Sequence, residues 1–258
     1  MTPSGGRDIV PDWRAIELAE VGSTQADALD RAIAGERGPL WIRADVQTRG
    51  RGRSGRGWAT PSGNFAATLL FAPRCAPASL PELSLVTGVA AVEAVLALAG
   101  PATSLAGKLR LKWPNDLLVG RAKRGGILVE TTTLGQDLLA MIGIGINIRS
   151  APPVPGREIA ALADHMSRSP TPSEVLQALA RSMQLTLSTW RAGEGFHSIR
   201  TRWLELAGPL GEPLTVNTGD GPVSGTFAGL DTDGALLLLG SEGQTRRFTF
   251  GDVTLGRS

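Results

Sequence analysis

Residues that build disulfide and metal scaffolds are scarce in this sequence. The 258 residues include one cysteine, Cys75, and two histidines, His165 and His197, which lie far apart. A single cysteine excludes an intramolecular disulfide and a cysteine-based zinc site, and the distant histidines argue against a histidine metal cluster. A chain of this length buries enough apolar surface to fold without such supports. We therefore predict no metal site built by the protein itself.

Segments that direct a chain to a membrane are also missing. Residues 1–13 (MTPSGGRDIVPDW) contain no apolar core of a signal peptide, and no run of about 18 apolar residues is present. Hydrophobic residues make up 42% of the chain and charged residues 19%, which is typical of a soluble globular protein. These features predict a cytoplasmic enzyme or binding protein without a membrane partner.

No large charge of one sign is present overall, but arginine is concentrated in one segment. The formal net charge is +2, which does not establish a DNA-binding footprint. Residues 49–57 (RGRGRSGRG), called the glycine–arginine loop below, hold four arginines, four glycines and no acid. A flexible solvated tail is the plain alternative, but the segment lies inside the chain between two apolar runs.

Residues 50–55 of this loop match the dinucleotide-binding pattern G-x-G-x-x-G. That pattern requires a helix directly after its last glycine, whose amides bind the pyrophosphate. Gly57, Pro61 and Gly63 prevent such a helix, and no Walker A sequence is present. Glycine amides and guanidinium groups still suit a small phosphate- or carboxylate-bearing anion. A nucleic-acid backbone is the competing ligand, although it normally recruits basic residues beyond one loop.

Hydrophobic patterning predicts an α+β fold followed by a small β-barrel. Short apolar segments bounded by turn residues predict strands at 15–20, 40–48 and 65–72 and in LRLKW, DLLV, GILVET and LLAMIGIGINI. Helical spacing and capping residues predict helices from Ser23 or Thr24 to Gly35, over 81–99, from Ser173 to Trp190 and over 196–207. From Gly208 onward, short strands separated by turn signals predict the barrel. Residues 1–15 are expected to form a loose tail.

Polar residues accompany the short strands in the middle of the chain. Lys112 in KWPND and Lys123 in KRGGILVE could face one site from adjacent strands, although lysines near strand ends are often merely solvated. Asp116 could cap a turn, or it could orient or deprotonate an amine. Asn147, at the end of GIGIN, offers both a donor and an acceptor.

Together these segments resemble the biotin protein ligases. VGST, QTRGRGRSGRGW, KWPNDLL, KRGGILVE and GIGIN follow one another in the order and spacing of that family. The resemblance implies a catalytic domain over 16–207, with a mixed, mainly antiparallel sheet flanked by helices, as in class II aminoacyl-tRNA synthetases. It implies an SH3-like β-barrel over 208–258. Residues 1–15 are too few for the DNA-binding domain that some members carry, so a ligase-only form without DNA binding is expected.

The family's reaction gives the expected activity and partners. Biotin and ATP react to biotinyl-5′-AMP and pyrophosphate, and the biotinyl group then passes to one lysine of a biotin carboxyl carrier domain of a carboxylase, acetyl-CoA carboxylase or a related one. Biotin and ATP are therefore the expected substrates, and Mg²⁺ is expected to accompany ATP through phosphate oxygens and water. The oligomeric state stays open between a monomer and a weak homodimer.

The resemblance also implies roles for single residues. Biotin is expected to contact Ser23, Thr24, Gln25, Gln47, Arg51, Gly52, Arg53 and Lys123. Gln25 stands where the family usually has asparagine, and a helix cap is the plain alternative for Ser23. The nucleotide is expected to contact Arg51, Arg53, Trp58, Asn115 and Asn147, with packing as the alternative for the last three.

Catalytic roles are implied for Lys123, Arg53, Asp116 and Lys112. Together with Arg51, the three cations would offset the repulsion between the biotin carboxylate and the α-phosphate. Lys123 is expected on both groups. Strand alternation places Arg124 on the opposite face. The acceptor lysine must attack as a free amine, which is rare at neutral pH, and Asp116 is the proposed base. A purely structural turn role for Asp116 is the alternative.

Two rival functions follow from the same residues. A lipoate ligase or lipoyl/octanoyl transferase shares the fold and the carrier lysine, but its R-R-x-x-G-G-G-like segment is missing here. A nucleic-acid-binding protein built around the glycine–arginine loop is disfavoured by the loop's interior position and by the low net charge.

Overall fold

The computed structural model describes residues 7–10, 13–100 and 104–256. Strand β1 (Arg7–Val10) pairs antiparallel with β2 (Trp13–Val21). The segment expected to be a loose tail therefore joins the sheet through residues 7–10, where the β-branched Ile9 and Val10 favour a strand. The rest of that expectation, over residues 1–6 and 11–12, lies outside the described residues.

A mixed eight-stranded sheet forms the body of the molecule, as predicted. Its order is β1-β2-β3-β4-β8-β7-β6-β5, and only β2 and β3 run parallel. The remaining strands are β3 (Leu40–Gln47), β4 (Phe65–Phe71), β5 (Leu109–Lys112), β6 (Asp116–Val119), β7 (Ala122–Leu134) and β8 (Asp137–Ile146).

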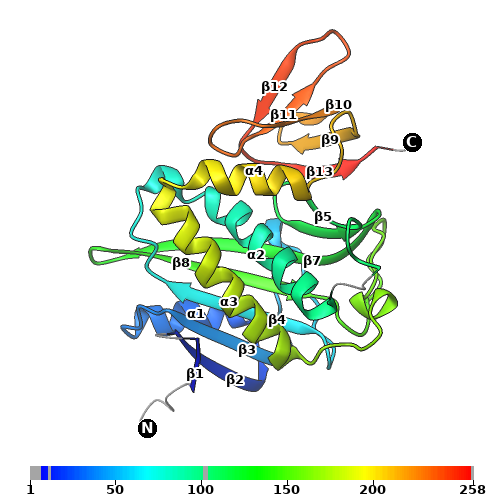
Figure 1. The fold of residues 1–258 in the computed structure, drawn as a ribbon. Coiled ribbons are helices and arrows are strands. Elements are labelled where there is room, and N and C mark those ends of the chain that lie inside the picture. Colours follow the sequence, from blue (N-terminus) through cyan, green and yellow to red (C-terminus); the bar gives the residue numbers. More distant parts are fainter. Residues whose placement is uncertain (1–6, 11–12, 101–103, 257–258) are drawn as a thin grey trace.

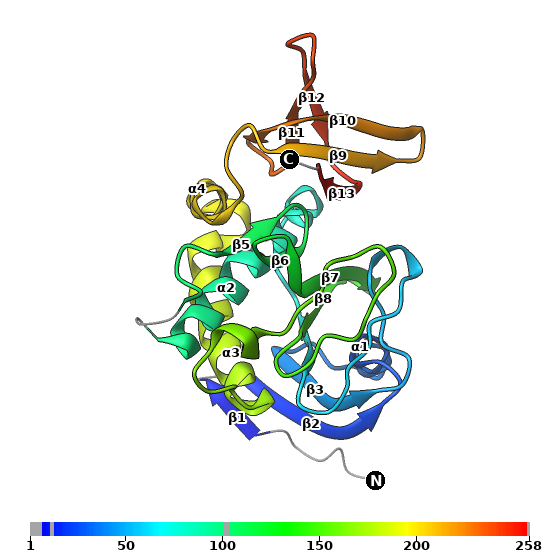
Figure 2. The same cartoon turned by 90° about the vertical axis from the view of Figure 1, so that its right-hand side faces the viewer.

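Helices cover both faces of this sheet. Helix α1 (Thr24–Ile33) packs on one face against β3, β4 and β8. Helices α2 (Glu82–Ala99), α3 (Pro172–Trp190) and α4 (Phe196–Leu206) cover the opposite face (Figures 1 and 2). The larger hydrophobic core lies between the sheet and these three helices and continues into the C-terminal part of the chain, for example at Val216 and Leu236. The smaller core lies under α1.

Strand β8 shows how one sequence serves both faces. Ile142, Ile144 and Ile146 point into the larger core, because side chains two apart share a face of a strand. Gly143 and Gly145 therefore face the other way, toward the side on which α1 lies. Over residues 142–146, the alternation of isoleucine and glycine therefore places bulky side chains on one face of β8 and no side chains on the other.

One helix departs from the expectation that no membrane-spanning segment is present. Helix α2 is 18 residues long and apolar enough to cross a membrane by length and composition, and 67% of it is buried inside the protein. It packs against α3, α4 and β7. Its apolar character is therefore explained by its place at the centre of the larger core.

The C-terminal part forms a second, five-stranded antiparallel sheet with the order β12-β11-β10-β9-β13. Its strands are β9 (Pro213–Thr218), β10 (Gly221–Leu230), β11 (Leu236–Leu239), β12 (Thr245–Phe248) and β13 (Asp252–Leu255). Strand β13 was not predicted, because its four residues carry little hydrophobic signal. Side chains of the first part of the chain contact this sheet, for example Arg200 of α4, which donates to the carbonyl of Asp231 (2.8 Å). The Trp113 indole N–H donates to the carbonyl of Gly234 (3.1 Å), and Arg110 pairs with Glu212 (2.8 Å).

Helix α3 begins differently from the prediction. Its N-cap is Thr171 rather than Ser173, and the Thr171 hydroxyl accepts a hydrogen bond from the backbone N–H of Glu174 (3.2 Å). The Glu174 carboxylate accepts in turn from the backbone N–H of Thr171 (2.7 Å), which completes a capping box. Ser173 instead donates to Glu17 (2.9 Å).

We expect Thr171→Ala to lower the melting temperature by about 2–4 °C, since an N-cap is lost from a chain of this size. Thermal unfolding followed by circular dichroism measures the shift. Ser188→Ala is the matched control, because Ser188 lies exposed on the same helix and donates only to the carbonyl of Leu185. Equal melting temperatures for Thr171→Ala and the unmodified protein would show that the capping box contributes nothing.

Candidate active site

A cavity of about 930 Å³ lies where the α1 face of the main sheet, the glycine–arginine loop and strand β13 meet. It brings together nearly all of the predicted site residues. The lining contains Ser23, Thr24, Gln25, Gln47, Arg51, Gly52, Arg53, Trp58, Lys112, Asn115, Asp116 and Lys123. These residues come from segments up to a hundred positions apart in the sequence. Asn147 lies outside this lining.

Buried polar side chains form one end of the cavity, at the start of α1. The backbone N–H and hydroxyl of Thr24 both donate to Gln47 Oε1 (2.9 and 3.1 Å), and Gln47 Nε2 donates to Thr60 (3.1 Å). Thr68 donates to the Thr24 hydroxyl and to Gln25 Oε1 (2.9 and 3.1 Å). The network fixes the amide of Gln47 and leaves little rotational freedom in this wall.

Ser23 is the exception in this network. It occupies the N-cap position of α1, yet its hydroxyl makes no capping hydrogen bond, and its buried Oγ has no partner among the described residues. A buried hydroxyl without a partner costs free energy. Ser23 therefore offers a free donor and acceptor to a ligand in the cavity, whereas the predicted capping hydrogen bond is not formed.

The glycines of β8 make room for two large side chains of the site. A Cβ atom on Gly145 would lie 2.2 Å from the Trp58 ring, and a Cβ on Gly143 would lie 2.7 Å from Gln25 Oε1. Gln25 Nε2 donates to the carbonyl of Met141 on the same strand (3.0 Å). Because the glycines of the GIGIN motif have no side chains, Gln25 and Trp58 can lie directly against the strand.

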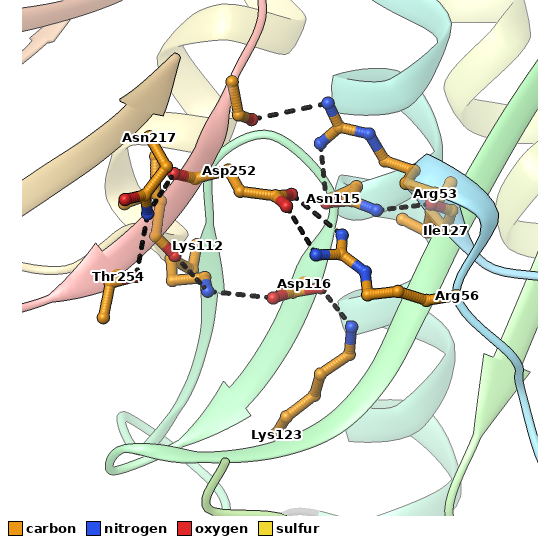
Figure 3. A network of polar contacts seen from close by, with 12 residues as sticks. Arg53, Arg56, Lys112, Asn115, Asp116, Lys123, Ile127, Asn217, Asp252 and Thr254 are labelled. Atoms are coloured by element: carbon orange, nitrogen blue, oxygen red, sulfur yellow. Dashed lines mark hydrogen bonds and ion pairs between the residues drawn. The ribbon is translucent and has the colours of Figure 1, made fainter. Parts of the chain in front are cut away.

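The glycine–arginine loop is a tight hairpin that contains a short 3₁₀ turn, Arg53–Gly55. Ser54 and Gly55 adopt left-handed backbone angles (φ 55° and 71°), and the N–H of Gly52 donates to the carbonyl of Arg56 (2.7 Å). Figure 3 shows Arg53 and Arg56 reaching toward the C-terminal domain. Arg51 turns away from them and pairs with Glu130 on β7 (3.3 Å).

Three charged side chains form the centre of the cavity. Asp116 accepts from Lys123 Nζ (2.5 Å) and pairs with Lys112 Nζ (2.9 Å). Burial acts to raise the pKa of Asp116, but the two ammonium groups outweigh it and hold that pKa below its ordinary value. Burial lowers the pKa of Lys123, although Asp116 opposes this shift. The Lys123 ammonium also lies 5.7 Å from the centre of the Trp58 ring, within cation–π range.

Arg124, next to Lys123, points to the other side of the sheet, as predicted. It is buried and donates to the carbonyl of Ala161 (2.7 Å) and to the Asp164 carboxylate (2.9 Å). Its second terminal nitrogen lies 2.9 Å from His165 Nε2. Arg124 therefore anchors the segment that returns from the loop 149–158, while Lys123 serves the cavity.

The three asparagines of this region have different surroundings. Asn115 lies in the lining, accepts from Arg53 (3.2 Å) and donates to the carbonyl of Ile127 (2.6 Å). Asn147 is buried, and its backbone N–H donates to the carbonyl of Arg124 (2.7 Å). Asn64 was not singled out from the sequence, yet its Oδ1 accepts from three consecutive backbone N–H groups, those of residues 148–150. A single asparagine in a turn gives no signal of such a role.

Other members of the lining were also missed. Arg56, Arg121 and Asp252 line the cavity, and Asp252 comes from strand β13 of the second sheet. A carboxylate about 200 positions from its arginine partner cannot be found from local patterns. Among the described residues, no group of three or more His, Cys, Asp or Glu side chains is placed to hold a metal ion.

Comparison with known proteins agrees with this geometry. The model of the biotin/lipoate A/B protein ligase family matches residues 20–147, and that of the biotin protein ligase C-terminal domain matches residues 210–256. The first model is named for biotin and lipoate ligases together, whereas the second is named for biotin protein ligases.

Single relatives match over most of their length. Biotin--[acetyl-CoA-carboxylase] ligase of Paracoccus denitrificans is 39% identical over 236 residues, which cover 88% of this chain and 95% of that protein. The bifunctional ligase/repressor BirA of Escherichia coli is 31% identical, over 92% of this chain and 73% of that protein. The structure of biotin protein ligase from Aquifex aeolicus in complex with biotin and ATP is similar with a TM-score of 0.77 and 28% identity, over 95% of this chain and 99% of that one. The chain therefore belongs to the biotin protein ligase family.

Proposed function

We propose that this protein is an ATP-dependent ligase that activates biotin as biotinyl-5′-AMP and transfers it to one lysine of a biotin carboxyl carrier domain. The observation that carries the proposal is a single cavity with two contrasting parts. One end is a buried hydrogen-bonding wall around Ser23 and Gln47, which suits the ureido ring of biotin. Lys112 and Lys123 at the centre and Arg53 on the loop side suit the carboxylate and the phosphates.

In the first step, a carboxylate oxygen of biotin attacks the α-phosphorus of ATP and pyrophosphate leaves. Both reactants are anions, so their approach needs fixed positive charge. Lys123 lies between the polar wall and the loop, and it binds the carboxylate and the phosphoryl oxygens. Arg53 and Asn115, joined by a hydrogen bond, hold the nucleotide side. Trp58 covers the ligand from its place against Gly145.

In the second step, the amine of the carrier lysine attacks the acyl carbon and AMP leaves. The carrier ammonium group must first give a proton to solvent water, and Lys112 and Lys123 favour this because nearby positive charge lowers the pKa of an entering ammonium group. The second proton, lost from the nitrogen as the amide forms, passes to the phosphate of the leaving AMP or to water. Asp116 keeps a lowered pKa and is a weak base. Its role in this step is to orient the amine rather than to deprotonate it.

Further features complete the proposal. Mg²⁺ enters with ATP, bound by phosphate oxygens and water. Of the carboxylates in the described lining, Asp116 and Asp252 are already paired with cations through both oxygens, which leaves Glu158 as the side chain that could approach the ion. The carrier belongs to acetyl-CoA carboxylase or a related carboxylase, the protein does not act through DNA, and it works in the cytoplasm as a monomer or weak homodimer. The burial of α2 supports the absence of a membrane partner.

A direct test mixes the protein with ATP, Mg²⁺ and biotin and measures the release of pyrophosphate. Lipoate and octanoate in place of biotin test the rival function. We expect release with biotin alone among these acids, followed by labelling of a carrier domain. Release with lipoate or octanoate but not with biotin would overturn the proposal.

We predict that Lys123→Ala reduces the rate of adenylate formation by about 10- to 150-fold, which corresponds to a charge-assisted hydrogen bond of roughly 1.5–3 kcal/mol. Arg124→Ala is the matched control. It removes hydrogen bonds to Ala161 and Asp164 and lowers the melting temperature, but Arg124 is not part of the cavity lining formed by the described residues. Pyrophosphate release is measured at a temperature where circular dichroism shows both variants folded. Comparable losses at both positions would contradict the assignment of Lys123.

A second prediction concerns pH. The first step needs Lys123 protonated, so its rate falls as the pH rises through the pKa of Lys123, which burial already holds below that of a free lysine. Asp116→Asn removes the opposing carboxylate, and the alkaline limb should move to lower pH. Glu130→Gln removes a carboxylate that pairs with Arg51 instead, and the limb should stay in place. Single-turnover rates across the alkaline range decide between the two outcomes.

A third prediction concerns retention of the intermediate. Among the described residues, Arg53 donates to Asn115 and Gly251 at 3.2 and 3.4 Å, and both acceptors are neutral, so its charge can hold the adenylate. Arg53→Gly should still form adenylate but release it faster and biotinylate unrelated proteins such as serum albumin. Arg49→Gly is the control, because Arg49 belongs to the same loop but lies outside the cavity lining formed by the described residues. Unchanged release from Arg53→Gly would mean that this arginine does not retain the intermediate.

A further inference from the structure

One edge of strand β13 is paired with β9, and the other edge faces the catalytic domain. Along that second edge, alternate carbonyl groups accept hydrogen bonds from three cations of the cavity lining. Gly251 accepts from Arg53 (3.4 Å), Val253 accepts from Lys112 (2.7 Å), and Leu255 accepts from Arg121 (3.0 Å). Carbonyl groups are neutral, so these contacts orient the three side chains without cancelling their charge.

Asp252 differs from these neighbours because it binds through its side chain. Its two carboxylate oxygens accept from the two terminal nitrogens of Arg56, at 2.5 and 2.9 Å. This is the planar two-point geometry in which arginine and carboxylate bind most strongly. Figure 3 shows the pair between β13 and the glycine–arginine loop, beside Lys112 and Asp116. The Arg56 guanidinium holds the pKa of Asp252 below its ordinary value, so the carboxylate is ionised at neutral pH.

Because Arg56 is hydrogen-bonded to other residues of the loop, its contact with Asp252 also affects the position of Arg53. The backbone N–H of Arg56 donates to the carbonyl of Arg53 (3.2 Å), and its carbonyl accepts from Gly52 (2.7 Å). Fixing Arg56 therefore fixes the turn that carries Arg53. The glycines of this loop make it costly to order, because glycine loses more conformational freedom than any other residue. If Asp252 already holds the loop in place, nucleotide binding has to offset less of this loss of conformational entropy.

We propose that Asp252 is a positioning residue for the adenylation step: by binding Arg56 it docks the glycine–arginine loop on the C-terminal domain, with Arg53 facing the cavity, before ATP binds. The proposal rests on the function proposed above and adds a role for a residue of the second domain. The opposite role is that Asp252 competes with the triphosphate for Arg56. The two roles predict opposite changes in the KM for ATP.

The test uses Asp252→Asn, which keeps the shape of the side chain and removes its charge. We expect the KM for ATP and the release rate of biotinyl-5′-AMP to rise by about two- to fivefold, the range typical of a partly exposed ion pair. The kcat at saturating ATP should change less. Asp252→Glu should restore part of the loss. An unchanged or lower KM for ATP in Asp252→Asn would overturn the proposal.

Glu212→Gln is the matched control. Glu212 forms the other ion pair that joins the second sheet to the main one, with Arg110 at 2.8 Å, and both residues lie outside the cavity lining given by the described residues. If loosening the domain contact were enough, this variant would raise the KM as Asp252→Asn does, and the specific role of Asp252 would fail. Arg56→Gln combined with Asp252→Asn should be no worse than the more severe single variant. Additive effects would show that the two residues act separately.

Limited proteolysis without substrates separates this proposal from the proposed function. Trypsin should cut after Arg51 or Arg53 faster in Asp252→Asn than in the unmodified protein, because the loop is released. Glu212→Gln should be cut at the unmodified rate. If the unmodified protein forms no adenylate but this difference in cutting rate is observed, the proposed function is refuted and the docking of the loop by Asp252 is supported. Equal cutting rates for Asp252→Asn and the unmodified protein would refute the docking.

Discussion

The cavity depends on one buried carboxylate held between two ammonium groups. Asp116 alone could not remain ionised at 6% exposure, and Lys112 and Lys123 alone would repel each other. Together they leave one net positive charge in the centre of the site. Because Lys112 ends β5 and Lys123 lies near the start of β7, the trio also fixes the edge of the sheet on both sides of β6. The two ion pairs of Asp116 therefore have two effects. They leave a net positive charge for the chemistry, and they stabilise the edge of the sheet formed by β5, β6 and β7.

Local patterns predicted most of the fold and the parts of the site that belong to continuous motifs. The main strands, the four helices and the opposite directions of Lys123 and Arg124 follow from residue spacing. The cap of α3 was misplaced by two residues, because Thr171 and Ser173 are both good capping residues and only the reciprocal bond to Glu174 distinguishes them. The segment 7–10 was missed because it is only four residues long, although Ile9 and Val10 favour a strand and its partner β2 begins at Trp13.

What the sequence could not predict are contacts between distant segments. Asn64 reaches the backbone of residues 148–150, and Asp252 reaches Arg56, each across a long stretch of chain. Nothing near Asn64 or Asp252 distinguishes it from an ordinary turn or strand residue. The unfilled hydrogen-bonding capacity of Ser23 is likewise visible only after the surrounding wall is in place.

The edge of β13 has a consequence for how this family is compared. Three cations of the site are held by main-chain carbonyls of residues 251, 253 and 255, and every amino acid supplies the same carbonyl. At positions 253 and 255 the side chain can change while the carbonyl remains. Gly251 is more restricted, because its φ is 141° and a Cβ there would lie 2.8 Å from Val216 Cγ1. A comparison of side chains would therefore miss the role of residues 253 and 255, although the backbone of this strand orients three of the cations that line the cavity. A functional contact made through a main-chain carbonyl is not recorded in the identity of the side chain at that position.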